Sequence, residues 1–599
     1  MSPRRRLLRW VMWFTAVHTG LLAVIGLRYL WLYIRLSPDV AWVYAPLAFV
    51  GQIAALGYLP VLLLIVPLAA LVPWAPLVVA LTVAVGSAGA AFLMLDSLVF
   101  AENRYHLSIL TATLLAPQTW VFLGIYFVLG LAIEGMLARL VWRRTAEGPT
   151  ARWPGRLVAW GLVLCFVAGH LMHAWFEARY DVAVTSFTRY LPLYFPLRDT
   201  KVQVRLGLID RAAARERGVV EALARHPAGE LQYPLHPLTC SPAQPLPNVL
   251  LIVIDAMRAD ALNPQAAPRM SEFARGATRF AHHYSGGNAS RAGMFSIFYG
   301  VPATYWDAFA GFARPPLLMD LFRQHHYQLG LFASSPIYRG VGLDRTVLAR
   351  IPNLRLETSS TLAGSSGRDR TLTEEWFRWL DDREPGRPFF GFLYYNAVVA
   401  IEPPDDYPAV FQPPPRPTRQ QRNYARYQNA VHFVDGLVGR VLDDLRKRRL
   451  LDDLLVIITS DHGMEFDENG LGFFGHGTSY SEYQMHTPLL IRWPGRTPEV
   501  IERRTSHNDL APTLLTRLFG CTNPPSDYSS GQDLYTGSPW PWLVAASYSE
   551  FALLEPDRVT IVYPASYEIR DRNYRLIPHP TPPRDALLEA QKEMGRFYR

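Results

Sequence analysis

The first third of the chain is dominated by long apolar segments that carry no charged residue. Five of them occur before residue 178, and each approaches or exceeds the length of about 20 residues that a bilayer-spanning helix needs. They are Trp10–Gly26, Ala45–Leu71, Pro76–Leu95, Gln118–Ile133 and Leu157–Phe176. No small-residue cleavage site follows the first segment, and four more come after it, so a signal peptide is disfavoured. The pattern predicts a five-helix transmembrane domain over residues 1–178.

Basic residues predict the orientation of these helices. One cluster precedes the first helix and another surrounds the connection between the fourth and fifth helices. The clusters are Arg4, Arg5, Arg6 and Arg9, and Arg139, Arg143, Arg144, Arg152 and Arg156. Because short loops rich in Lys and Arg stay in the cytoplasm, the N-terminus is expected inside the cell. Five crossings then place the rest of the chain outside the cytoplasm.

Four ionisable residues fall in or near the apolar segments. They are Asp96, Glu134, His170 and His173. A proton or ion path is the functional interpretation of such residues. We instead expect all four near helix ends, at the membrane interface, with no charge at the centre of a span. This expectation disfavours a transporter.

Residues 179–246 have a different pattern and are predicted to form an interfacial linker. The aromatic and proline-rich stretch Tyr190–Arg198 suits a membrane surface. A short amphipathic helix is predicted to follow it. Its apolar stripe is Val202, Leu206 and Ile209, and the basic candidates for anionic lipid headgroups are Arg198, Lys201 and Arg205. A solvated basic face with no ligand explains the same pattern equally well.

From residue 247 to 599, strand-length apolar runs alternate with helical periodicity. The runs are Val249–Ile254, Gln328–Ala333, Phe389–Tyr395, Leu454–Ile458 and Pro488–Trp493. A helix between the third and fourth runs has one apolar face, from Tyr427 to Leu445. This alternation predicts an α/β domain with a mainly parallel sheet flanked by helices. In such sheets ligands bind beyond the carboxyl ends of the strands.

The residues that follow these strands are typical of a metal site. Asp255 follows the first strand, and Asp461 and His462 follow the fourth. Ser290 lies in a glycine-led turn before a predicted helix, where backbone N–H groups favour an anion. Two acids and a histidine can hold a divalent cation, which would lower the pKa of the Ser290 hydroxyl. His476, in Gly-His-Gly, is the candidate for binding the anionic ester or protonating a leaving group.

Net charge and cysteines add two points. The formal net charge of +8 partly reflects the basic membrane loops, and no aromatic-interleaved basic motif suggests nucleic-acid binding.

Of the three cysteines, Cys165 falls in the fifth apolar segment. Cys240 and Cys521 both fall on the non-cytoplasmic side, where disulfides persist, and an even pair suggests a bridge between them.

The Asp255 strand, the Ser290 turn, Asp461-His462-Gly463 and His476 together resemble the alkaline phosphatase/sulfatase superfamily. With the five-helix N-terminus, Gln232–Leu235, Ser285–Asn288 and Phe298–Gly300, the whole chain is similar to the YejM/PbgA family of inner-membrane sulfatase-like proteins. The resemblance implies a multi-pass protein of the Gram-negative inner membrane with its C-terminal domain in the periplasm.

The same resemblance implies control of lipopolysaccharide and outer-membrane lipid balance. Membrane lipids and the lipid A part of lipopolysaccharide are the implied ligands, sensed through the linker, and a LapB-type adaptor is the implied protein partner. Asp255, Asp461 and His462 match metal-ligand positions of the superfamily, for one ion of Mg, Mn or Zn. His476 matches a substrate-side histidine.

Three positions depart from the superfamily pattern. Ser290 is the candidate nucleophile, but an ungapped match to lipoteichoic acid synthases places that position at Ala289. A substrate-binding histidine often follows the third strand, where this chain has Val399. Met464 stands where Glu is common after Asp-His-Gly. Two functions therefore remain: a lipid regulator on a hydrolase scaffold, or a metal-dependent phosphoesterase or phospho-group transferase acting on a lipid headgroup.

Overall fold

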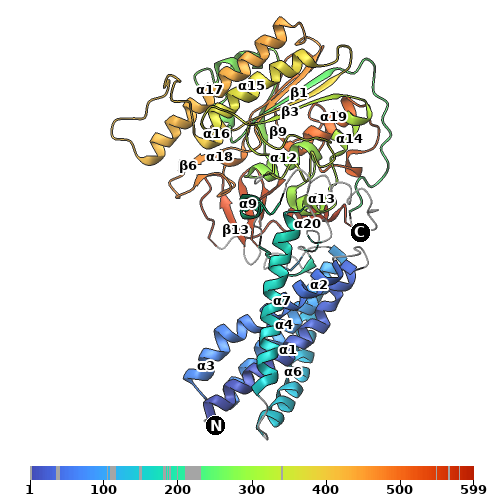
Figure 1. The fold of residues 1–599 in the computed structure, drawn as a ribbon, viewed down its shortest axis with the longest axis vertical. Helices are drawn as coiled ribbons and strands as arrows, with labels where there is room; N and C mark the ends of the chain where they lie inside the picture. Colours follow the sequence, from blue (N-terminus) through green and yellow to red (C-terminus); the bar gives the residue numbers. More distant parts are fainter. Residues whose placement is uncertain are drawn as a thin grey trace. The chain divides into compact units, whose positions relative to one another are not determined.

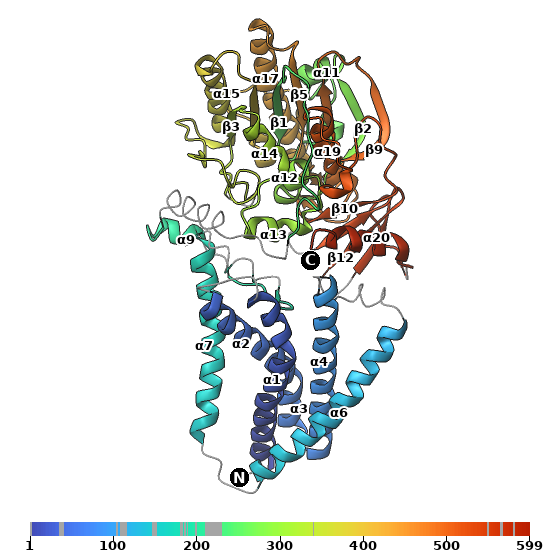
Figure 2. The same cartoon turned by 90° about the vertical axis from the view of Figure 1, so that its right-hand side faces the viewer.

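The computed structural model divides the chain into two compact units, which we describe separately (Figures 1 and 2). One unit is Met1–Leu231 with Tyr598–Arg599, and the other is Gln232–Phe597. The residues that the structure describes are 3–34, 41–103, 106–107, 117–146, 152–179, 184, 187, 190–197, 200–209, 231–338, 341–547, 550–563, 567–578 and 581–598. Residues 232–246, which we assigned to the linker, fold with the C-terminal unit.

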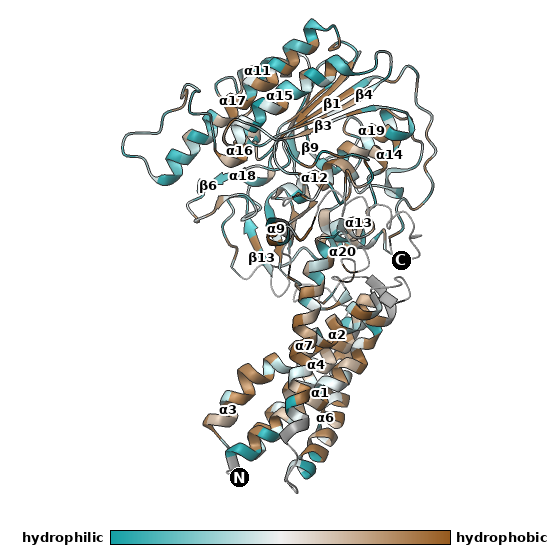
Figure 3. Ribbon diagram, viewed as in Figure 1, coloured by the Kyte–Doolittle hydropathy of each residue, from teal (hydrophilic) through white to brown (hydrophobic). Residues whose placement is uncertain are grey.

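Five helical spans of the N-terminal unit are long and apolar enough to cross a membrane, as the sequence predicted. The helices are α1 (Pro3–Ile34), α2 (Ala41–Pro60), the π-helical turn η1 (Val61–Ile65), α3 (Val66–Leu71), α4 (Ala75–Asn103), α6 (Pro117–Ala146) and α7 (Arg152–Glu177). α2, η1 and α3 together form the second span. Figure 3 shows hydrophobic residues along most of these helices.

Glycines bring the helices of this unit close together. A Cβ on Gly51 of α2 would lie 2.5 Å from the Cα of Phe166 in α7. A Cβ on Gly130 of α6 would lie 3.2–3.3 Å from Ser87 of α4. Small residues at such crossings let backbones approach where lipid provides no hydrophobic drive for association. α2 is thereby packed on α7, and α4 on α6.

The expectation that all ionisable residues lie near helix ends is wrong for Glu134. It lies near the middle of the span Val121–Thr145 and is fully buried. Its Oε1 atom lies 2.5 Å from Nδ1 of His18, which is near the middle of the first span. Asp96, in contrast, lies close to the end of α4 and accepts the Tyr29 hydroxyl at 2.5 Å. Because Glu134 is an ionisable residue in the middle of a span, the argument that disfavoured a transporter does not hold.

The linker is described only in part. α9 (Thr200–Arg205) forms where the amphipathic helix was predicted, and Arg205 is exposed in its last turn. Several apolar residues within α9 and on either side of it in the sequence are exposed: Leu193, Phe195, Leu197, Val202, Leu206 and Leu208. Ile209, predicted in the same stripe, is buried instead. Arg198 and the side chain of Lys201 lie outside the described residues.

A seven-stranded sheet forms the centre of the C-terminal unit, in the order β3-β4-β1-β5-β8-β2-β9. The strands are β1 (Asn248–Ile254), β2 (Thr278–Tyr284), β3 (Gln328–Ala333), β4 (Phe389–Tyr395), β5 (Leu454–Thr459), β8 (Leu489–Arg492) and β9 (Val500–Ser506). Only β8 is antiparallel to its neighbours, so the predicted mainly parallel sheet is confirmed. β2 and β9 were not predicted.

Helices cover both faces of this sheet (Figure 1). On one face the main core packs α11 (Pro268–Ala274), α15 (Gly364–Asp382), α16 (Ala397–Ala400) and α17 (Arg419–Lys447) against β1, β4 and β5. On the other face lie α12 (Ser290–Tyr299), α14 (Leu317–Gln324) and α19 (Leu510–Arg517). Phe322 of α14 stacks on Phe390 of β4 there.

Smaller elements complete the unit. A two-stranded hairpin pairs β6 (Glu465–Phe466) with β7 (Phe474–Gly475), and α18 (Glu482–Met485) follows it. A second, antiparallel sheet contains β10 (Leu543–Ala546), β11 (Phe551–Leu554), β12 (Arg558–Val562) and β13 (Tyr567–Asp571). The remaining helices are η3 (Ala259–Ala261), η4 (Ala303–Tyr305), α13 (Trp306–Gly311), η5 (His507–Asp509), η6 (Pro525–Asp527) and α20 (Arg584–Gly595).

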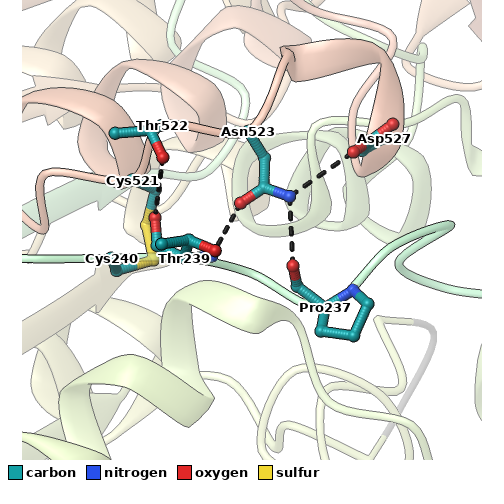
Figure 4. The surroundings of a disulfide bond; sticks show 7 residues. All are labelled: Pro237, Thr239, Cys240, Cys521, Thr522, Asn523 and Asp527. Atoms are coloured by element: carbon teal, nitrogen blue, oxygen red, sulfur yellow. Dashed lines mark hydrogen bonds between the residues drawn. A yellow bond between two sulfur atoms is a disulfide. The ribbon is translucent and has the colours of Figure 1, made fainter.

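A disulfide joins Cys240, just before β1, to Cys521, just after α19 (Figure 4). Hydrogen bonds reinforce the connection on both sides of it. Asn523 accepts the Thr239 backbone N–H at 2.7 Å and donates to the Pro237 carbonyl at 3.1 Å. The segment that enters the domain is therefore attached to its C-terminal part.

Candidate metal centre

The candidate site is built at the carboxyl ends of three adjacent strands. β4, β1 and β5 are neighbours and parallel, so their carboxyl ends meet at one edge of the sheet. Asp255 follows β1 directly, and Asp461 and His462 follow β5 after one residue. All three side chains are buried, and one ligand atom of each lies within 4.8 Å of the others.

The distances show how the three groups face each other. His462 Nε2 lies 3.4 Å from Asp255 Oδ1 and 3.7 Å from Asp461 Oδ2. His462 Nδ1 lies 2.8 Å from the Gly463 carbonyl, a contact that places the ring proton on Nδ1. Nε2 therefore presents its lone pair to the site, which is the form that a metal-binding histidine needs.

Ser290 enters the site at the first position of α12. Its Oγ lies 3.1 Å from His462 Nε2 and 3.5 Å from Asp255 Oδ1. Ala289, the alternative position, is the N-cap residue, and its buried methyl group offers no polar atom. Gly293 explains the close docking of α12, because a Cβ there would lie 2.0 Å from the Asp461 carbonyl oxygen. The structure brings Ser290 together with the three candidate ligands.

Two residues at the end of β4 belong to the site and were not singled out from the sequence. The Tyr394 hydroxyl lies 2.7 Å from Asp255 Oδ2 and 3.0 Å from Asp461 Oδ2. The Asn396 amide donates to Asp255 Oδ2 at 2.9 Å. The sequence pattern drew notice only to the lack of a histidine after this strand. Position alone indicates Tyr394 and Asn396, because polar residues at the end of β4 must lie beside the polar residues that follow β1.

The electrostatics of the centre favour a cation. Burial, and then the charge of Asp461, raise the pKa of Asp255 well above its usual range. Within the described part of the chain, His462 is the only basic side chain within 4 Å of either carboxylate. The Tyr394 hydroxyl has one hydrogen, for which two carboxylates compete. Two carboxylates, an imidazole nitrogen and a hydroxyl are ligands that fit Mg²⁺, Mn²⁺ or Zn²⁺.

His476 lies beside the centre on the loop after β7. Its ring stacks on that of His462 with centroids 4.6 Å apart. Burial, and then the neighbouring His462, lower the pKa of His476 to about 4, so it is neutral at pH 7. Glu465 of β6 holds this loop by accepting the hydroxyls of Ser479 at 2.5 Å and Ser481 at 2.8 Å. A neutral His476 can donate or accept a hydrogen bond, but it does not supply a positive charge to the site.

The two substitutions on the substrate side are accommodated by packing. Val399, in α16, packs against the main hydrophobic core. Met464 is a buried member of the same core. Neither position offers a polar group to a ligand, whereas the ligand side keeps its full set of polar groups.

Comparison with known proteins covers both units. Residues 2–240 match the family model described as domain of unknown function DUF3413, and residues 247–520 match the Sulfatase family model. The inner membrane protein YejM of Salmonella typhimurium is 28% identical over 608 aligned positions, which cover 99% of this chain and 97% of that protein. An uncharacterised protein of Haemophilus influenzae is 24% identical, with 99% and 96% covered.

A solved structure similar to this chain is the phosphonate monoester hydrolase of Silicibacter pomeroyi. It is 19% identical, with a TM-score of 0.46, and the match covers 58% of this chain and 94% of that one. A phosphonate monoester hydrolase of Agrobacterium radiobacter matches with a TM-score of 0.44 at 16% identity.

Proposed function

We propose that this chain, a YejM homologue with a DUF3413 region and a sulfatase-like domain, regulates lipopolysaccharide and outer-membrane lipid balance from the Gram-negative inner membrane. The observation that carries the proposal is the end-to-end match to an inner membrane protein. The aligned positions span both the five apolar helices and the sulfatase-like domain of this chain. In this proposal the C-terminal domain lies in the periplasm, in keeping with the basic residues around the cytoplasmic ends of the helices.

The linker is the proposed lipid-sensing element. Arg205 is exposed, and exposed apolar residues occur close to it in the sequence, a composition that suits a lipid headgroup above acyl chains. Arg198 and Lys201 complete the proposed basic set for lipid A phosphates. A LapB-type adaptor in the inner membrane is the proposed protein partner. Charge-neutral substitution of Lys201 and Arg205 should weaken binding to lipid A vesicles, and unchanged binding would leave these residues as a solvated face.

The C-terminal domain is proposed to bind one divalent metal ion through Asp255, Asp461, His462 and Ser290. Such an ion supplies positive charge for an anionic oxygen and lowers the pKa of a hydroxyl beside it. Tyr394 and Asn396 hold the Asp255 carboxylate in place. Gly463 holds the imidazole of His462 with Nε2 facing inward. His476 is placed to hydrogen-bond an anionic group that enters the site.

A working phosphoesterase or phospho-group transferase is the second candidate, favoured by the position of Ser290. Its Oγ lies 3.1 Å from His462 Nε2, within the same ligand set, where a bound cation would lower the pKa of the hydroxyl and favour loss of its proton. The deprotonated oxygen would then attack the phosphorus of a phosphate ester, the P–O bond to the alcohol would break, and His476 is the candidate to protonate the departing alcohol. The apolar residues Val399 and Met464 argue against this candidate, because they leave fewer groups to bind a substrate.

One pair of measurements separates the two candidates. A strain that depends on this protein would carry either the wild type or Ser290→Ala, with protein abundance verified by immunoblot. The regulator predicts normal lipopolysaccharide levels with Ser290→Ala, and the enzyme predicts their loss. In parallel, hydrolysis of p-nitrophenyl phosphate by purified protein with Mg²⁺, Mn²⁺ or Zn²⁺ should be absent for the regulator. Turnover that Ser290→Ala abolishes would establish the enzyme.

A further inference from the structure

The two carboxylate oxygens of Asp255 have different surroundings in the candidate metal centre. Oδ2 accepts hydrogen bonds from the Tyr394 hydroxyl at 2.7 Å and from the Asn396 side-chain amide at 2.9 Å. Oδ1 faces the other candidate ligands, at 3.5 Å from Ser290 Oγ and 3.4 Å from His462 Nε2. The groups that hold Oδ2 therefore decide which oxygen of Asp255 a cation would meet.

Asn396 is itself held by the first turns of α15. Its backbone N–H donates to the buried carboxylate of Asp369 at 3.0 Å, and the backbone N–H of Ala397 donates to the same carboxylate at 2.9 Å. The buried Ser365 hydroxyl lies 3.2 Å from the side-chain Oδ1 of Asn396. The backbone and the side chain of Asn396 are thus both fixed by one helix, which supplies none of the proposed metal ligands.

Arg368, also in α15, determines the direction of these hydrogen bonds. Its Nη2 donates to Ser365 Oγ at 2.8 Å, and its Nε donates to the backbone carbonyl of Ser334 at 3.1 Å. Guanidinium nitrogens only donate, so the Ser365 oxygen accepts from Arg368 and its single hydrogen is left for Asn396 Oδ1. With Oδ1 occupied, the NH2 group of Asn396 is the part of the amide that faces Asp255. Each donor from Arg368 to Asp255 therefore points toward the metal centre.

This chain of hydrogen bonds begins at a positive charge. Arg368 is partly buried, and within the described part of the chain its hydrogen bonds go only to uncharged oxygens. Hydrogen bonds in series polarise one another, so a cation at the start strengthens the last bond, from Asn396 to Asp255. The guanidinium thus acts on the carboxylate through two intermediate side chains and without touching it.

We propose that Arg368 is a positioning residue of the metal centre. Through Ser365 and Asn396 it holds the Asp255 carboxylate with Oδ1 toward the bound cation. This inference rests on the proposed metal-binding function and extends the site to α15. Loss of the guanidinium should therefore lower the affinity for the metal although every ligand remains in place.

The test is a calorimetric titration of the full-length protein in detergent micelles with Mn²⁺, after bound metal has been removed with EDTA. Arg368→Met and Ser365→Ala should each raise the Kd about tenfold, at the lower end of the effect typical of groups that orient metal ligands. The double variant should lose no more affinity than either single variant, because both side chains act through one chain of hydrogen bonds. Arg368→Lys keeps a charged donor and should recover most of the affinity.

Arg378→Met is the matched control, because it removes the same charge from an exposed position of the same helix, and it should leave the Kd unchanged. The melting temperature of each apo variant checks its folding, and Ser365→Ala carries the test if Arg368→Met does not fold.

Four results would overturn the inference while the proposed metal site stands. They are unchanged Kd values in Ser365→Ala and Arg368→Met, losses that add in the double variant, no recovery in Arg368→Lys, or an equal loss in Arg378→Met. A wild-type protein that binds no Mn²⁺ would instead overturn the proposed metal site, and this inference with it.

Discussion

Both units bury ionisable side chains, but they compensate them in opposite ways. In the membrane helices, His18 and Glu134 face each other, and no described residue donates to the second carboxylate oxygen of Glu134. In the C-terminal domain, Asp255 and Asp461 receive hydrogen bonds from Tyr394, Asn396 and backbone N–H groups at the strand ends. The first cluster is a closed pair in the sense that one histidine faces one carboxylate, and the second cluster has an excess of acidic groups.

This difference shows what each cluster is built for. A histidine–carboxylate pair needs no further ionic partner, and its removal as a pair need not cost stability. Two carboxylates that face one imidazole and one phenol are not fully compensated in charge, and a bound cation would compensate them. The membrane pair thus has its partner within α1 and α6, whereas the acid cluster has the geometry that the proposed metal site requires.

The largest effect that tests the comparison is expected in the membrane unit. Glu134→Leu should destabilise the protein by about 3–5 kcal/mol, because it leaves the His18 imidazole buried without its partner. The double variant His18→Leu/Glu134→Leu should regain most of that loss. Thermal unfolding in detergent micelles would measure both. Glu134→Gln is the control, since it keeps an acceptor oxygen and should lose less. Additive losses in the double variant would show that the two side chains are not a closed pair.

A second prediction concerns the acid cluster. Asp461→Asn keeps the shape of the side chain and removes one charge, so it should weaken affinity for Mn²⁺ by at least about 100-fold. Calorimetric titration of the apo protein would measure this. Asp452→Asn, an exposed residue before the amino end of β5, should leave the affinity unchanged. Equal affinities in the two variants would remove Asp461 from the metal site.

A third, smaller effect should come from Tyr394. Tyr394→Phe removes the hydroxyl that contacts both carboxylates, and loss of a group that orients ligands typically costs about 10–100-fold in metal affinity. The same titration would detect it. The protein should remain folded, because the ring stays in place. An unchanged affinity would mean that Tyr394 only fills space between the acids.

The smallest predicted effect is a dependence of stability on pH. His283 is buried, none of the described carboxylates pairs with it, and burial lowers its pKa well below the ordinary value. At pH 6.5 and below, this histidine takes up a proton in the unfolded chain but stays neutral in the folded chain. Its contribution to the free energy of unfolding is therefore fully present above pH 6.5 and is lost as the pH falls. His283 should contribute a loss of about 1 kcal/mol between pH 6.5 and 5.5.

A melting curve of the C-terminal domain at each pH would check this effect. His283→Gln should make the melting temperature less dependent on pH, whereas His282→Gln, on the exposed side of the same strand, should not. An unchanged slope in His283→Gln would exclude this histidine as a source of acid sensitivity.

The sequence predicted the five spans and the central strands because each is an uninterrupted apolar run. Its failure at Glu134 has a physical reason. A run without charged residues ends at Ile133, but the helix continues to Ala146, and His18, 116 positions away, contacts one oxygen of the Glu134 carboxylate inside the bundle. Only the tertiary structure reveals such a partner.

Other elements and residues that the sequence did not predict were missed for similar reasons. β2 and β9, at one edge of the sheet, alternate buried and exposed residues and lack the apolar run that marked the central strands. Asp255, Asp461 and His462 could be selected from the sequence because they directly follow buried strands. Tyr394 could not be distinguished in the sequence, because β4 is rich in aromatic residues. Only the register of β4 beside β1 places its hydroxyl between the two acids.

The bridge between Cys240 and Cys521 also determines how mechanical force passes through the molecule. Tension on the polypeptide upstream of residue 240 would be transmitted through the sulfur atoms into the loop after α19. β1, which begins eight residues later and carries Asp255 at its end, would be bypassed. A pull from the membrane side would then leave the metal centre unstrained, and single-molecule extension under reducing and oxidising conditions would show a longer unravelling step only in the reduced protein.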